Sequence, residues 1–117
     1  MSINSRNKGK VGELELAHIL SQYGFTVRRG QQYCGANGDA DVVGLPLLHI
    51  ECKRVENLNL DKAMEQAMSD CKDGLIPVVM HRKNHKKWKV TMTLEDFMKF
   101  YNTYLNVESV GGENENS

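Results

Sequence analysis

Apolar residues near the start of the chain recur with the spacing of an α-helix, from about residue 8 to residue 23. At 100° per residue, Leu16, Leu20 and Tyr23 fall on one face of this predicted helix. Glu13 projects into the same face. A carboxylate on the apolar side of a helix is costly unless a cation or a hydrogen-bond donor meets it, so Glu13 is a candidate buried acid.

Further along the chain, short apolar runs predict five strands and two more helices. Residues 39–44 and 47–53 are strand-like runs joined by a very short turn, which predicts an antiparallel hairpin. Thr93, with Asp96 three residues later, predicts the start of a last helix. That helix is expected to pack on the domain through Leu94, Phe97, Met98 and Tyr101. The other predicted elements are strands at 25–29, 76–80 and 87–92 and a helix at 60–73.

The predicted order is therefore helix, three strands, helix, two strands, helix. Strands and helices that are interleaved in this way predict an α/β fold, with a mixed β-sheet flanked by helices. The length of 117 residues suits one domain, which we place at residues 1–105. Within it, residues 1–7 are expected to form a loose basic arm. Residues 106–117 show no apolar periodicity and are expected to form a disordered acidic tail.

The charge of the chain sums to zero, with 15 Lys and Arg against 15 Asp and Glu, but the cations are clustered. A basic surface around an acidic pocket is expected where a polyanion approaches a metal site. Lysine-rich stretches also occur simply as solvated faces, so charge only supports other observations. The candidate contacts to nucleic acid are Arg6, Lys8, Lys10, Arg28, Arg29, Arg82, Lys83, Lys86 and Lys87.

Three features bear on where such a chain would work. No apolar run approaches the roughly 18 residues that a membrane span needs. The first ten residues are polar and basic, and no apolar segment of a secretion signal follows them. The three cysteines are an odd number without a CxxC pair, which favours a reducing compartment. We therefore expect a cytoplasmic protein with no membrane partner.

The candidate chemistry lies on the predicted hairpin. Side chains alternate along a strand, so Glu51 and Lys53 point the same way, and Asp41 begins the neighbouring strand. Two converging carboxylates resist ionising together unless a divalent cation joins them, and Mg²⁺ prefers such oxygen ligands. With an ammonium group nearby, this set suits phosphodiester hydrolysis. Taken singly, Asp41 could instead start a turn, Lys53 could be a strand-end charge, and Glu13 could pair with a lysine.

These motifs resemble those of a known family. The segments Gly38-Asp-Ala-Asp41 and Ile50-Glu-Cys-Lys53 resemble the PD-(D/E)xK nuclease motif. The opening Lys8-Gly-Lys-Val-Gly-Glu13 resembles that of the Holliday junction resolvases of archaeal and phage type. The resemblance covers about residues 6 to 104 and implies the restriction-endonuclease-like fold.

The resemblance also implies roles for individual residues. Asp41 and Glu51 would bind Mg²⁺, with Mn²⁺ as a substitute, helped by the backbone carbonyl of Cys52. Glu13 would complete the metal site directly or through water. Lys53 would position the attacking water and stabilise the phosphorane-like transition state. A glutamine on the following helix, Gln66, would orient Lys53 or the water.

One departure from the motif concerns its first acid. The motif name expects a proline next to the aspartate, whereas this chain has Asp39 two residues before Asp41. Asp39 is therefore an alternative ligand or an outer-shell partner. The loop before it, residues 30–38, holds no serine or threonine that could contact a phosphate.

The sequence as a whole predicts a Mg²⁺-dependent, structure-selective DNA endonuclease. By the resemblance it would act as a homodimer on four-way junctions, in recombination, repair or phage DNA processing. Two alternatives stay open. One is the same chemistry on flaps, nicks or single strands, and the other is a non-catalytic nucleic-acid-binding module of the same fold.

Overall fold

The computed structural model describes the backbone of residues 2–31 and 40–116 and the side chains of residues 9–31 and 40–107. Its order of elements is the predicted one, which confirms the α/β fold class. In chain order the elements are α1 (Ser2–Ser21), β1 (Arg28–Arg29), β2 (Val42–Val43), β3 (Leu48–Arg54), α2 (Leu60–Asp70), β4 (Ile76–Arg82), β5 (Lys89–Thr91) and α3 (Leu94–Asn116).

The strands form one mixed sheet in the order β1-β2-β3-β4-β5. Strands β3 and β4 are parallel and are joined through α2, whereas the other neighbours are antiparallel. The pairing of Val42 with Ile50 confirms the predicted hairpin. Gly44 in its turn has a φ of 113°, and a Cβ there would lie 2.1 Å from the carbonyl oxygen of Thr26. Only glycine fits this turn, because the segment before β1 passes directly beneath it.

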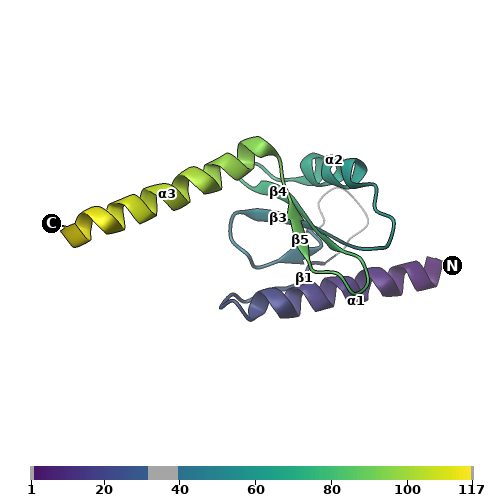
Figure 1. Cartoon of the computed structure of the whole chain (residues 1–117). Coiled ribbons are helices and arrows are strands. Elements are labelled where there is room, and N and C mark those ends of the chain that lie inside the picture. The colour runs from purple at the N-terminus through teal and green to yellow at the C-terminus, as the bar shows by residue number, and fades with distance from the viewer. Residues whose placement is uncertain (1, 32–39, 117) are drawn as a thin grey trace.

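Each face of the sheet is covered by a different helix (Figure 1). Leu16 and Ala17 of α1 pack with one set of strand residues, including Ile50, and this cluster is the larger core. Ala63 and Ala67 of α2 pack on Val79 from the opposite face. Because Val79 is in register with Glu51 in the neighbouring strand, the Glu51 side chain lies on the α2 face.

Both ends of the chain differ from the sequence prediction. Helix α1 begins at Ser2 rather than after a loose arm, and α3 runs to Asn116 through the segment expected to be disordered. The prediction rested on missing apolar periodicity. A helix that has already formed extends at little cost per residue, so it can run past the last packed turn. No helix in the described part of the chain combines the length and the apolar character needed to cross a bilayer.

The last helix also departs from the prediction in its packing. Thr93 caps it as expected, since its Oγ1 accepts a hydrogen bond from the backbone NH of Asp96 at 3.2 Å. The helix then projects away from the sheet (Figure 1), and its expected packing residues are exposed, with Leu94 at 76%. The ring of Trp88 packs on the core that α1 covers, and its Nε1 donates to Glu15 of α1 at 3.0 Å.

Candidate active site

The two hairpin acids converge as the sequence predicts. The backbone NH of Asp41 donates to the carbonyl oxygen of Ile50 at 3.1 Å, which places Asp41 beside β3. The backbone NH of Cys52 then donates to Oδ2 of Asp41 at 2.8 Å. The carboxyl groups of Asp41 and Glu51 are themselves hydrogen-bonded to each other. Asp41, directly before β2, and Glu51 of β3 therefore form one carboxyl pair at this edge of the hairpin.

This pair is electrostatically unfavourable without a cation. Glu51 is only 7% exposed, and burial raises the pKa of its carboxyl group to about 8. Burial is the largest cause of this net value, to which the Asp41 charge and the hydrogen bond to Asp41 also contribute, while the Lys53 ammonium opposes the rise. At neutral pH the pair therefore holds a proton. A divalent cation can replace that proton, so the donor chemistry of the pair fits a metal ion.

Glu13 reaches the same site from α1. It is 9% exposed, and Arg29 of β1 donates from Nε to its Oε1 at 2.5 Å. Burial raises the pKa of Glu13, Arg29 opposes this, and the nearby Asp41 charge raises it again. The structure confirms that a buried acid on α1 is met by a cation. That cation is Arg29, which the sequence predicts as a DNA contact.

Lys53 lies close to all of these acids. It is half-buried on β3, and its charge lowers the pKa of both Glu13 and Glu51. Three acids, from α1, from the residue before β2 and from β3, thus share one neighbourhood with one ammonium group. The structure brings together Glu13, Asp41, Glu51 and Lys53, four of the five predicted catalytic residues.

The fifth, Gln66, has a different partner. Its side chain is exposed on α2, and its Nε2 donates to Oδ2 of Asp70 at 2.6 Å rather than to Lys53. Asp70 is not among the predicted residues, although its charge contributes to the raised pKa of Glu51 and opposes the lowering of the His49 pKa by burial. The available signal was its position four residues after Gln66, on the same side of the helix.

The acids that a metal ion would meet form a pair rather than a cluster of three, among the described residues. Among the described residues, no three His, Cys, Asp or Glu side chains form a ready-made metal cluster. The reason is that Glu13 turns to Arg29, which leaves Asp41 and Glu51 as the converging pair. Mg²⁺ typically keeps several waters and uses one or two protein carboxylates, so a pair is sufficient. The alternative ligand Asp39 lies outside the described residues.

Cys52 can contribute only through its backbone. Its side chain is buried on the α1 face of the sheet. Burial, followed by the charges of Asp41 and Glu13, raises the pKa of its thiol to about 12. The thiol is therefore neutral at physiological pH and is no nucleophile or thiolate ligand. This leaves its carbonyl oxygen as the group that could meet a cation.

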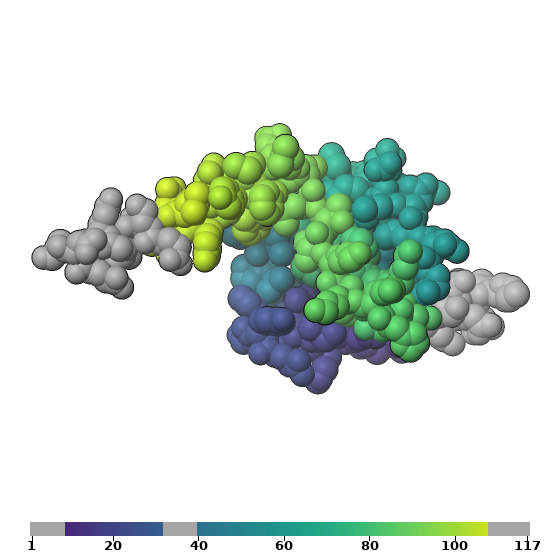
Figure 2. All heavy atoms as spheres, in the orientation of Figure 1, coloured from purple at the N-terminus to yellow at the C-terminus, as the bar shows by residue number. Residues whose placement is uncertain are grey.

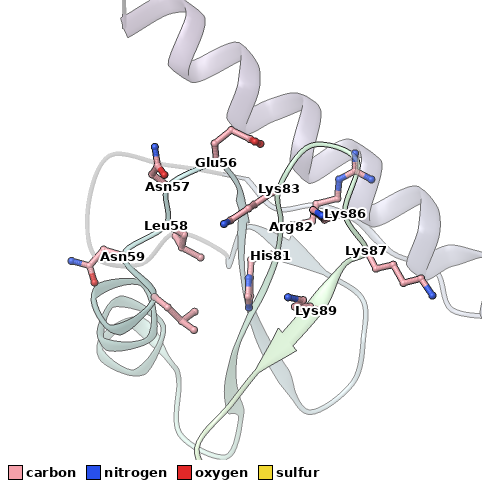
Figure 3. Close-up of a pocket in the computed structure, with 11 residues that line it drawn as sticks. Glu56, Asn57, Leu58, Asn59, His81, Arg82, Lys83, Lys86, Lys87 and Lys89 are labelled. Atoms are coloured by element: carbon pink, nitrogen blue, oxygen red, sulfur yellow. The ribbon is translucent and has the colours of Figure 1, made fainter.

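A basic groove lies next to this site. It has a volume of about 670 Å³ and runs between the segment that follows β3 and the β4–β5 hairpin (Figure 3). Lys53 is in register with His81 on the adjacent parallel strand, so the groove continues from the Lys53 side of the sheet. Only Glu56 is acidic among the lining residues, and it accepts a hydrogen bond from the NH of Asn84 at 2.6 Å. The basic lining residues are His81, Arg82, Lys83, Lys86, Lys87 and Lys89.

The predicted DNA contacts divide into two groups. Lys83, Lys86 and Lys87 are exposed in the groove, and Lys10 and Arg28 are exposed elsewhere. By contrast, two of the arginines are engaged in ion pairs, Arg29 with Glu13 and Arg82 with Glu15. Arg6 and Lys8 belong to α1, but their side chains lie outside the described set.

One polar network was not predicted at all. Glu15 of α1 accepts contacts from Arg54 at 3.1 Å, from Arg82 at 3.3 Å and from the Trp88 indole. Gly12 lets α1 lie close to β3, because a Cβ at this position would lie 2.9 Å from the Cβ of Arg54. The network holds α1 against β3 and so keeps Glu13 at the carboxyl pair.

Comparison with known proteins identifies the family. The family model described as "Phage putative PDDEXK endonuclease" matches residues 4–112, a span that holds the whole site and the groove. No curated protein and no solved structure matches the chain. On the extent of the family match, the chain belongs to the phage putative PDDEXK endonuclease family.

Proposed function

We propose that this chain is a Mg²⁺-dependent DNA endonuclease that selects branched DNA, foremost the four-way junction, and works as a homodimer. The observation that carries the proposal is the buried, hydrogen-bonded pair of Asp41 and Glu51 beside Lys53. Membership of a PDDEXK endonuclease family supports nuclease chemistry. The likeness of the α1 segment around Glu13 to that of junction resolvases supports the substrate.

Asp41 and Glu51 would hold the metal ion, with the Cys52 carbonyl oxygen beside them. When bound, Mg²⁺ or Mn²⁺ supplies charge neutralisation at the phosphodiester and lowers the pKa of water. Lys53 donates hydrogen bonds to a non-bridging phosphate oxygen and stabilises the charge that develops there. Glu13, held by Arg29, orients water at the edge of the site.

The basic groove would hold the DNA backbone. Ammonium groups contact phosphates without reading bases, which suits recognition by shape rather than by sequence. Because the groove adjoins Lys53 through the pairing with His81, one continuous strand could pass from the lysines to the carboxyl pair. One site cannot cut two opposed strands of a junction, so symmetric cutting requires a second copy related by a twofold axis.

Incubation of the purified protein with a labelled four-way junction tests this proposal. We expect paired nicks on opposed strands in Mg²⁺ or Mn²⁺, and no product in excess EDTA. Flap, nicked, linear and single-stranded DNAs of the same sequence serve as matched substrates. Equal cutting of these DNAs would retain the nuclease but overturn junction selectivity. Binding without a metal-dependent product on any of them would overturn the nuclease and indicate a non-catalytic binding module.

A further inference from the structure

Helix α3 carries a wide apolar face that nothing covers among the described residues. At 100° per residue, its apolar side chains occupy one half of the helix circumference, and residues such as Glu95, Lys99 and Asn102 occupy the other. The apolar side chains are between 38% and 76% exposed. They are Leu94, Phe97, Met98, Phe100, Tyr101, Tyr104, Leu105 and Val107. A patch of this kind marks an interaction surface.

The same chain has an open apolar groove on the opposite face of the sheet from the basic groove. It has a volume of about 330 Å³ and lies between α1 and the strands. Leu16, Met80 and Trp88 form its floor, and Tyr23 and Phe25 stand partly exposed at its rim. Its lining is almost entirely apolar, so it suits hydrophobic side chains and not phosphate groups.

The helix does not cover the groove of its own chain. Thr93 fixes the start of α3 through its carbonyl oxygen, which accepts from the NH of Phe97 at 2.9 Å, and through its cap to Asp96. From there α3 makes no extended contact with any other described helix or strand. In Figure 2 the yellow part of the helix extends beyond the body of the molecule.

We infer that the helix and the groove are partners of each other in a twofold dimer, in which α3 of each copy lies on the α1 groove of the other. One chain supplies both complementary surfaces, so a single twofold axis produces two identical contacts and leaves neither surface open. Because the twofold axis repeats the contact between α3 and the groove, the buried surface area is doubled. This helps such a dimer reach the roughly 1,600 Å² that stable interfaces bury.

The composition of the helix supports a second copy as the occupant. Its exposed face is rich in aromatic residues and methionine, which are enriched at the cores of protein interfaces. Phe97 and Tyr101 are already stacked, with ring centroids 6.0 Å apart, so little side-chain freedom is lost when they dock. The polar half of α3 would remain in solvent.

The mass of the full chain in solution is the first test, by light scattering or sedimentation between about 1 and 100 μM. We expect a species of twice the 13.2 kDa chain mass. Tyr101→Glu should convert it to monomer, whereas Asn102→Glu, its neighbour on the polar half, should not. Phe25→Glu in the groove should have the same effect as Tyr101→Glu, with Thr26→Glu as its exposed control. Far-UV circular dichroism verifies that each variant folds.

A disulfide exchange test distinguishes the second copy from other occupants. Tyr23→Cys and Tyr101→Cys are placed on two differently tagged copies, each with Cys34→Ser and Cys71→Ser. Mixing under mild oxidation should give a covalent heterodimer. A monomer at every concentration, a dimer that survives both Tyr101→Glu and Phe25→Glu, or the absence of a 23–101 link between the two copies would each overturn the inference. The inference rests on the homodimer of the proposed function. None of these readouts requires metal or DNA cleavage, so their failure would leave the nuclease chemistry of the carboxyl pair untouched.

Discussion

The carboxyl pair and the basic groove are neighbours that are built in opposite ways. Asp41 and Glu51 are fixed by a backbone NH and by each other, with Glu51 buried in the sheet. Lys83 and Lys86 extend from an exposed hairpin and hold no fixed partner among the described residues. Fixed, desolvated charges act on a reacting group with large energies, whereas exposed charges contribute small, salt-screened increments. The first region should therefore determine rate and the second affinity.

The largest expected effect comes from the carboxyl pair. Asp41→Asn and Glu51→Gln each remove a negative charge from the proposed metal site while keeping its shape. We expect the single-turnover cleavage rate to fall on the order of 10³-fold or more, with junction affinity nearly unchanged. Glu65→Gln on the exposed side of α2 is the matched control. If either site variant cuts at the parental rate in Mg²⁺, the assignment of the metal site is wrong.

Lys53→Ala should have the next largest effect. Loss of a positioned donor at the phosphate costs about 10² to 10³ in rate. Single-turnover kinetics and gel-shift affinity, measured side by side, separate rate from binding. Lys62→Ala, exposed on α2, provides the comparison. A loss of affinity with no loss of rate would make Lys53 an ordinary phosphate contact. The region of the carboxyl pair would then, like the basic groove, contribute to affinity.

Substitutions in the groove should change affinity and leave the rate of the bound complex intact. For Lys83→Ala and Lys86→Ala together, we expect several-fold weaker junction binding. The slope of log affinity against log salt should fall by about 0.9 for each lost phosphate contact. Titration of labelled junction between 50 and 200 mM salt measures both quantities. An unchanged salt slope would remove the groove from the DNA path.

The smallest expected effect is on stability against pH. Because the pKa of Glu51 is raised to about 8 in the folded chain, the folded state binds more protons than the unfolded one between its usual pKa and 8. The contribution of Glu51 to the free energy of unfolding is therefore complete at acid pH and is lost as pH rises toward 8. In EDTA the Tm should fall over this range, and Mg²⁺ should remove most of the fall. Glu51→Gln should show neither dependence, and a parental Tm that rises with pH in EDTA would contradict the buried pair.

Local patterns predicted much of the site, and long-range packing accounts for what they missed. The shared direction of Glu51 and Lys53 follows from strand alternation, and the position of Asp41 follows from a short hairpin. The relative positions of these side chains can therefore be predicted from residues close to them in the chain. The contact between Glu15 and Arg82 joins elements far apart in the chain and leaves no periodic signal.

Helix α3 also shows that local patterns predict an element but not its packing partner. Its amphipathic pattern correctly predicted a helix with an apolar face, beginning at the Thr93 cap. The pattern alone does not determine which surface that face meets. In the structure it makes no extended contact with the other described helices and strands of its own chain.

The spacing of the two hairpin acids has a consequence for how the protein comes together. Ten positions separate Asp41 from Glu51, whereas Glu13 must arrive from a helix nearly thirty positions upstream. Short loops close at little entropic expense and on a submicrosecond timescale. The carboxyl pair that we propose to bind the metal ion can thus be assembled by one small turn with Gly44 at its bend, before the amino-terminal helix has docked on the sheet.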